Sequence, residues 1–215
     1  MLKLIKKEFA LALHPTCVVF LFFAAFVFIP NYPYEVMFFF SALAAYFVCL
    51  TGRENKDLCF TCALPVEKKS VALARVLFFV ILQLALVLLC ALFSAVKTAF
   101  LDMPNAAGME ANAVLAANGL VMLGIFNAVF FPPYFREPEK IGKPFVIGAV
   151  ALFLFVAAVT ACCFAVPFVR DVLDTPDPEH FGAKLIYLAA AALIYAALTS
   201  FSALRSMKNF EKTDL

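Results

Sequence analysis

The chain has 215 residues, of which 65% are hydrophobic and only 15% are charged, and its mean hydropathy is +0.97. A soluble domain carries roughly a quarter of its residues as charged side chains, and one core of this size cannot bury so much apolar surface. The composition therefore excludes an ordinary soluble domain and indicates a protein whose surface faces lipid. The net charge of +2 gives no reason to expect a nucleic-acid partner.

The first predicted element is an interfacial helix over residues 2–13. This segment carries Lys3, Lys6 and Lys7, and its apolar residues recur near helical spacing, which is typical of a helix lying along a membrane surface. Six apolar runs follow, and each predicts a membrane-spanning helix. Their expected bounds are 15–29, 36–51, 71–96, 112–131, 144–169 and 183–204. We predict an all-α polytopic membrane protein, with residues 1–215 forming a single transmembrane domain.

The distribution of positive charge predicts the orientation. Fourteen of the 17 Lys and Arg residues lie in the N-terminal segment, in residues 52–75, in residues 134–143 and in the C-terminal tail. Because Lys and Arg are retained on the cytoplasmic side, we predict that both termini are cytoplasmic. The loops 97–110 and 170–182 would then face outward.

The 170–182 loop is acidic. It holds Asp171, Asp174, Asp177 and Glu179. Two interpretations stay open for it, a solvated acidic loop and a site for a cation or a basic ligand.

Motifs for catalysis are missing from the sequence. It has no phosphate-binding loop, no His-Glu-x-x-His motif and no Gly-x-Ser-x-Gly motif. Its two histidines, His14 and His180, are far apart in the sequence. Cys59-x-x-Cys62 supplies only half of a zinc site. We predict no catalytic residue, no metal site and no cofactor in this chain.

Polar residues inside the predicted spans are few. No predicted span has an Asp or Glu near its centre, which argues against a carrier coupled to protons or sodium. Gln83, Asn118 and Asn127 either join helices by hydrogen bonds or line a substrate path.

The segment between the second and third spans, residues 53–69, mixes charged and apolar residues. Residues 53–63 are compatible with a short helix, and Leu64-Pro65 would end it because a residue before proline is disfavoured in helical conformation. Such a helix suits the docking of a cytoplasmic protein, and a solvated loop is the alternative.

This segment resembles the cytoplasmic loop of type-2 ABC transporter permeases, in which a helix with an acidic start leads into Leu-Pro-Val and then basic residues. The matching positions are Glu54, Asp57, Thr61, Leu64, Pro65, Val66, Lys68, Lys69 and Arg75. Lys7-Glu8-Phe9 is similar to the start of such permeases. The layout of six spans and the small size resemble bacterial permeases that export phenol-soluble modulins and other amphipathic peptides.

The resemblance implies a permease subunit in the plasma membrane, and most specifically a bacterial exporter of amphipathic or hydrophobic peptides. It implies two such subunits, identical or related, surrounded by membrane lipid, and a separate cytoplasmic ABC ATPase that binds ATP and magnesium. The short helix would then be the coupling helix that contacts this ATPase. Its contact residues would be Arg53, Glu54, Asn55, Asp57, Leu58, Phe60, Thr61, Leu64 and Pro65. The family also implies that residues 162–169 fold back into the membrane.

Two other functions stay open. The chain is alternatively a non-transporting regulator or assembly component that docks the same partner. A membrane enzyme ranks third, because no charged constellation marks an active site.

Overall fold

The computed structural model describes residues 1–101, 105 and 107–214, and the regular elements of this part of the chain are all helical. The α-helices are α1 (Leu2–Lys7), α2 (Pro15–Leu21), α3 (Val36–Glu54), α4 (Asp57–Cys62), α5 (Lys68–Phe100), α6 (Ala113–Arg136), α7 (Gly142–Ala165) and α8 (Phe181–Glu211). Two π-helical turns (Glu8–Ala12 and Val169–Leu173) and one 3₁₀ segment (Phe22–Phe28) complete them. The predicted all-α membrane architecture is confirmed.

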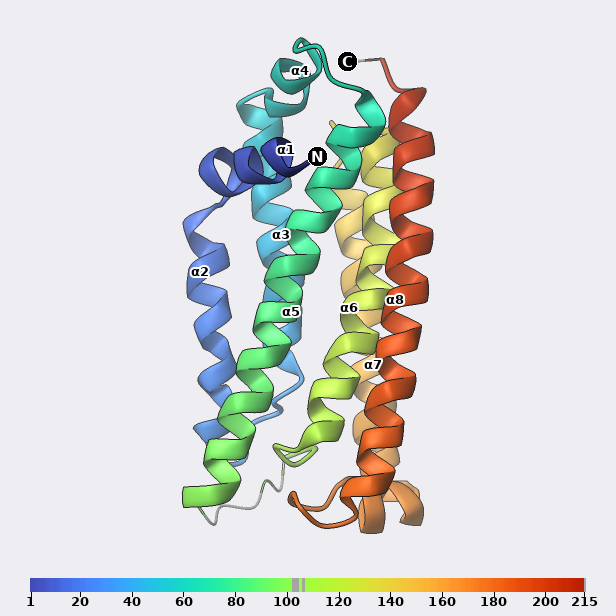
Figure 1. Ribbon diagram of the computed structural model, residues 1–215. Coiled ribbons are helices and arrows are strands. Elements are labelled where there is room, and N and C mark those ends of the chain that lie inside the picture. Colours follow the sequence, from blue (N-terminus) through green and yellow to red (C-terminus); the bar gives the residue numbers. More distant parts are fainter. Residues whose placement is uncertain (102–104, 106, 215) are drawn as a thin grey trace.

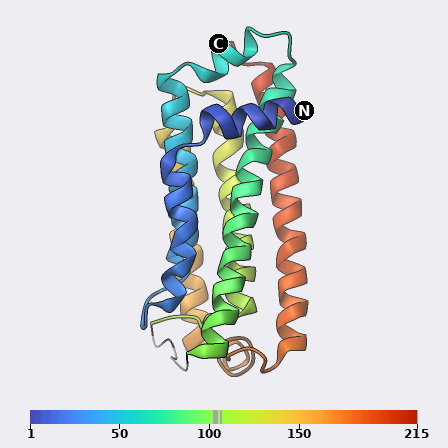
Figure 2. The same cartoon turned by 60° about the vertical axis from the view of Figure 1, so that its left-hand side comes forward.

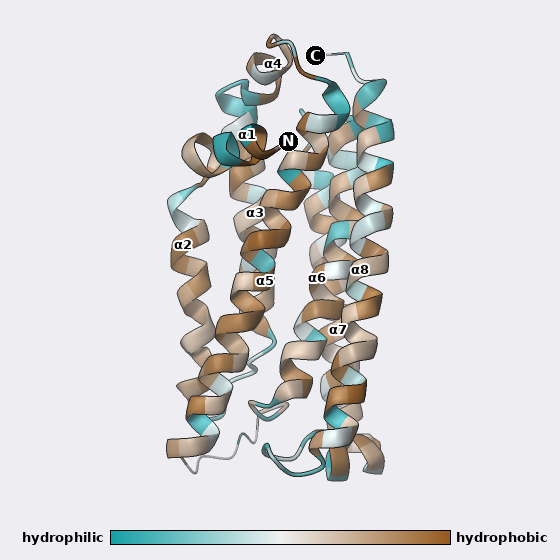
Figure 3. Cartoon of the chain, viewed as in Figure 1, coloured by the Kyte–Doolittle hydropathy of each residue, from teal (hydrophilic) through white to brown (hydrophobic). Residues whose placement is uncertain are grey.

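The long helices form an elongated bundle with both chain termini at the same end (Figure 1). Five of them, α3, α5, α6, α7 and α8, are long and apolar enough to cross a membrane, and a bent N-terminal pair makes a sixth if it counts as one span. Apolar residues cover the shafts of the helices and polar residues gather at both ends (Figure 3). We call the end with the termini the basic end and the opposite end the acidic end.

The predicted first span corresponds to a short helical segment that follows a sharp bend. Leu2–Ala12 lies across the bundle and makes an angle of 93° with Pro15–Phe28 (Figure 2). His14 stops the first part and caps the second, since its Nδ1 accepts a hydrogen bond from the Thr16 N–H and Pro15 suits a first helical turn. The α-helical and 3₁₀ halves, with rises of about 1.5 and 2.0 Å per residue, together reach roughly 25 Å.

Helix α6 is the centre of the bundle. In its most apolar stretch 78% of the residues are buried, and it packs between α5, α7 and α8. The helix runs to Arg136, although the sequence predicted an end at residue 131. It continues through Pro132 and Pro133 because Tyr134 and Phe135 are buried in the core. In addition, Asn209 of α8 donates a hydrogen bond to the carbonyl of Pro132, and Thr213, just after α8, donates one to the carbonyl of Phe135.

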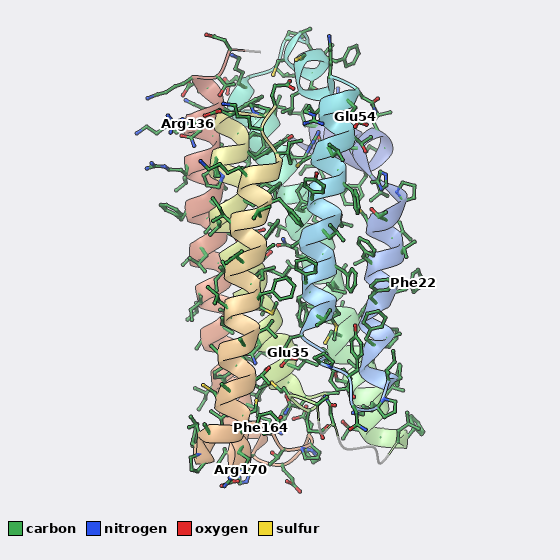
Figure 4. The ribbon with its side chains drawn as sticks, turned by 180° about the vertical axis from the view of Figure 1, so that it is seen from behind. Phe22, Glu35, Glu54, Arg136, Phe164 and Arg170 are labelled. Carbon is green, nitrogen blue, oxygen red and sulfur yellow. The ribbon has the colours of Figure 1, made fainter. Side chains whose placement is uncertain are left out.

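Helix α7 ends at Ala165, four residues before its predicted end. Val166 is extended (φ −102°, ψ 111°) because the following Pro167 disfavours helical conformation in the residue before it. Phe164 and Arg170 lie near this turn at the acidic end (Figure 4). The return of this segment into the membrane stays a prediction.

The loop predicted at 97–110 is shorter in the structure, because α5 extends to Phe100. Residues 102–104 and 106 of that predicted loop lie outside the described residues.

Candidate functional site at the basic end

The connection between α3 and α5 forms a compact helical turn rather than the single helix predicted over residues 53–63. Arg53 and Glu54 are the last residues of α3, and Lys56 then adopts a left-handed conformation with φ 53°. This reversal starts α4, whose first residue, Asp57, is favourable beside the positive end of a helix. The short helix therefore spans six residues and is held at an angle to α3.

Arg75 connects α4 to the rest of the bundle. It lies near the start of α5 and is fully buried. Its guanidinium forms ion pairs with Asp57 of α4 and with Glu8 of the first π-helical turn. An unpaired charge here would cost several kcal/mol, about 3–5 when one partner of a buried pair is removed. Arg75 therefore fixes the position of both neighbouring segments.

Lys7 completes the group of charges. Its Nζ lies 2.7 Å from Asp57 Oδ1 and 3.0 Å from Glu8 Oε1, and it donates a hydrogen bond of 3.0 Å to the Thr61 hydroxyl. Lys7, Glu8, Asp57 and Arg75 form what we call the four-charge cluster. Its two cations and two anions come from three segments of the chain and balance one another.

The electrostatics of the four-charge cluster keep Asp57 ionised. Burial alone would raise the pKa of its carboxyl, but the positive charges of Arg75 and Lys7 and their hydrogen bonds hold the pKa below its usual value. On the other side of the guanidinium, α3 approaches closely at Gly52, where an added Cβ would lie 3.4 Å from Arg75 Nη1. The cluster is therefore enclosed by α3 as well as by α4 and α5.

The predicted contact residues divide into two groups. Leu58 and Thr61 are buried against the bundle, and Asp57 belongs to the four-charge cluster. Arg53 donates a hydrogen bond of 3.2 Å to the carbonyl of Glu139, in the connection between α6 and α7. The others face outward and are exposed: Glu54, Asn55, Phe60, Leu64 and Pro65.

Two exposed apolar side chains stand out on this outward face. Phe60 is 67% exposed and Leu64 is 47% exposed. They border two open hollows on either side of α4, of about 360 Å³ and about 690 Å³. Exposed apolar side chains beside hollows at a polar end of the protein are typical of an interaction surface.

The predicted path residues lie inside the bundle. Gln83 of α5 and Asn127 of α6 exchange hydrogen bonds of 2.8 and 2.9 Å, and Tyr195 of α8 donates to Gln83. Asn118 accepts a hydrogen bond from Tyr187. These bonds join α5, α6 and α8, while a role along a substrate path stays a prediction.

No group of three or more His, Cys, Asp or Glu side chains in the described part of the chain is arranged to hold a metal ion. Cys59 and Cys62 are free thiols on α4.

The sequence interpretation missed the role of the N-terminal helix in holding α4. A signal for it was present, because Arg75 is a charge inside an apolar run and such a residue needs a partner. Lys7 and Glu8, in the N-terminal segment before the predicted first span, are charged residues that could supply this partner.

Comparison with known proteins assigns the family. A family model described as ABC-2 family transporter protein matches residues 3–211. The curated proteins and the solved structures gave no significant match. The match covers nearly the whole chain and confirms the resemblance to type-2 permeases that the 53–69 segment indicated. The chain therefore belongs to the ABC-2 transporter family, and it is a multi-pass membrane protein of the kind that forms the permease component of an ABC transporter.

Proposed function

We propose that this chain is the permease subunit of an ATP-driven exporter and that its α3–α4 connection binds a separate ABC ATPase subunit. The observation that carries the proposal is the division of residues 54–65 into a fixed side and a free side. The buried Arg75 ties α4 to α5 and to the N-terminal helix, whereas Phe60 and Leu64 remain exposed. A force applied to α4 would reach the spans without first deforming a flexible loop.

The proposed orientation follows from the charges. With the basic end in the cytoplasm, α4 faces the compartment that contains ATP. The ATPase subunit would bind ATP and magnesium, and this chain would supply neither. We propose that two permease subunits, identical or related, act together, as the family implies. The sparsely buried α7, with 11% of its apolar window inside the subunit, has free surface for lipid or for a second subunit.

We propose amphipathic or hydrophobic peptides as the exported class, on the basis of the resemblance to small peptide-exporting permeases. The 27 Phe residues do not decide this question. Phe130 and Phe131 are buried and pack on each other with ring centroids 5.2 Å apart, so this pair fills the core. Phe39 and Phe40 are only partly buried and are better placed to meet a hydrophobic cargo.

The test is to replace the outward apolar pair while leaving the four-charge cluster intact. In the double variant Phe60→Asp, Leu64→Asp, we expect co-purification of the ATPase from the native host to fall at least about tenfold. Each apolar side chain buried in the interface contributes about 1.5–3 kcal/mol of binding free energy, and a loss of about 1.4 kcal/mol already weakens binding tenfold. Lys140→Ala is the control, since Lys140 is 76% exposed at the same end.

Either outcome is informative. Retention of the ATPase by the double variant would contradict docking at α4. Binding of the ATPase without any ATP turnover that responds to cargo would instead favour a regulator or assembly component.

Pro65→Ala tests the coupling geometry. We expect the variant to fold and to bind the ATPase, because Pro65 is exposed, but to export less cargo per ATP hydrolysed, because α4 loses the residue that defines its end. The measurement is ATPase activity and cargo transport in the same proteoliposomes. Transport per ATP equal to that of the wild type would show that the end of α4 does not transmit the motion.

A further inference from the structure

At the acidic end, the loop after α7 is fastened to the start of α6. Asp174 Oδ1 accepts a hydrogen bond of 2.7 Å from the Glu110 N–H, and Asp177 Oδ2 accepts one of 3.0 Å from the Ala113 N–H. Asn112 donates to the carbonyls of Leu173 and Thr175. The segment before α6 and the connection between α7 and α8 are therefore joined at this end of the bundle.

The two interpretations of the acidic loop can now be compared with its contacts. Asp171 pairs with Arg170, and Asp177 pairs with the fully buried Lys184 at 3.0 Å. Together with the hydrogen bond that Asp174 accepts, these contacts hold the loop against the bundle through its own acidic side chains. Within residues 1–101, 105 and 107–214, no cluster of three or more His, Cys, Asp or Glu side chains could hold a metal ion.

Glu35 lies beneath this closure, immediately before α3. Its side chain is fully buried, and neither carboxyl oxygen has a hydrogen-bond partner among the described residues. Gly108 covers it, since a Cβ added there would lie 3.7 Å from Glu35 Oε2. Figure 4 shows Glu35 within the bundle, remote from Glu54 and Arg136 at the other end. An ionised carboxylate without donors is costly in such a place.

The surrounding charges do not compensate for Glu35. The titratable groups around it are Tyr34 beside it, Cys90 and Lys97 of α5, Glu110, Cys163 of α7 and Asp174. Lys97 is the cation of this group, and its Nζ already lies 3.6 Å from Glu110 Oε2 and donates to the Tyr34 hydroxyl. Lys184 also acts on Asp174, but it is already paired with Asp177. Two cations, each with another partner, thus face the three carboxyl groups of Glu35, Glu110 and Asp174.

We propose that Glu35 is a proton-binding site, and that its proton holds the acidic end of the bundle closed. A protonated Glu35 is neutral and fits beneath residues 107–112, where Gly108 lies against its carboxyl group. Loss of the proton places a negative charge beside Asp174 and Glu110, and the repulsion favours separation of the loop from the start of α3. If this end faces outward, a rise in external pH would favour its opening.

The pKa directions agree with this arrangement. Burial raises the pKa of the Glu35 carboxyl, and the negative charge of Asp174 raises it further. The nearby backbone N–H groups of Glu35 and Met109 lower it, although neither makes a hydrogen bond of normal geometry to the carboxyl. Burial also raises the pKa of Asp174 to about 6, although the Glu110 N–H lowers it. Groups with raised carboxyl pKa values hold more protons in the folded state than in the unfolded state, so stability falls as pH rises through this range.

The experiment compares the purified wild type with Glu35→Gln and Glu35→Met in lipid nanodiscs, without the ATPase. The readouts are the infrared carbonyl band of a protonated carboxylic acid and the melting temperature, both followed from about pH 5 to about pH 8. We expect the wild type to lose the band and to melt at lower temperature as pH rises. Both variants should show a weaker band than the wild type, because only the Glu35 contribution is removed and Asp174 still titrates in this range. Both should also lose most of the pH dependence of the melting temperature.

Glu179→Gln is the matched control, because Glu179 is an exposed acid at the same end and should keep the wild-type behaviour. The two Glu35 variants guard against misfolding, since Met removes both the charge and the need for hydrogen bonds. A wild-type band that is absent throughout the range, or a pH dependence unchanged in both Glu35 variants, would overturn the proposal. Because no ATPase is present, the result is independent of the proposed docking at α4.

Discussion

Replacing Arg75 with methionine is expected to lower the free energy of unfolding by about 3–5 kcal/mol, the usual cost of removing one partner from a buried ion pair. Methionine occupies much of the volume of the arginine side chain but leaves Glu8 and Asp57 with Lys7 as their shared cation. The position of α4 depends on these contacts, so we also expect weaker ATPase binding. Thermal unfolding in detergent, followed by circular dichroism, measures the first effect.

The matched control is Lys69→Met at the same end of the bundle. Lys69 pairs with Glu211 at 3.1 Å, but both side chains are 52% exposed, and exposed pairs contribute at most about 1 kcal/mol. Adding Glu8→Gln to Arg75→Met restores the balance of charge and should recover part of the loss. A melting temperature of Arg75→Met equal to that of the wild type would refute the fixing role of the four-charge cluster.

Gly119→Ala is expected to destabilise the contact between α3 and α6 by about 1–3 kcal/mol or more, because it overfills a packed core. The fully buried Phe38 ring lies directly on the Gly119 backbone, and an added Cβ would come within 3.0 Å of three ring atoms. The ring must move, and because Phe38 is fully buried its movement displaces the side chains packed around it. The loss of melting temperature in detergent measures this effect.

Gly142→Ala and Gly182→Ala are the matched controls, because nothing lies within 4 Å of an added Cβ at either position. Both glycines lie in the first turn of a helix, so we expect little change in the melting temperature. The double variant Gly119→Ala, Phe38→Leu should be more stable than Gly119→Ala alone, because leucine lacks the clashing ring atoms. Additive effects of the two substitutions would mean that the ring and the glycine are not in contact.

The positions of the long helices were predictable from the sequence because apolar length is a local property. Every predicted span corresponds to a helical segment of the structure, and differences are confined to the ends. Helix α7 ends early because the conformation of Val166 is set by its neighbour Pro167. Helix α6 ends late because burial of Tyr134 and Phe135 outweighs the local effect of two prolines. Local sequence thus determined one boundary and tertiary packing the other.

The candidate site was only partly predictable. The family resemblance marked the segment that includes α4, but it did not divide the residues that face outward, such as Phe60, from those that face the bundle, such as Leu58. That division follows from the left-handed Lys56, which sets the direction of α4. The partners of Arg75 were also hidden, since Glu8 and Asp57 are separated from it by 67 and 18 positions in the sequence.

The short first span has a consequence for the membrane around this protein. Its α-helical and 3₁₀ halves reach roughly 25 Å, whereas the hydrocarbon core of a typical bilayer is about 30 Å thick. The neighbouring α5, with 33 residues, extends roughly 50 Å. A single subunit thus presents a short edge and a long edge to the lipid, and hydrophobic mismatch is concentrated at the short one. The bilayer must become thinner at the short edge, so the lipids are deformed on the side of the subunit where the N-terminal helix lies.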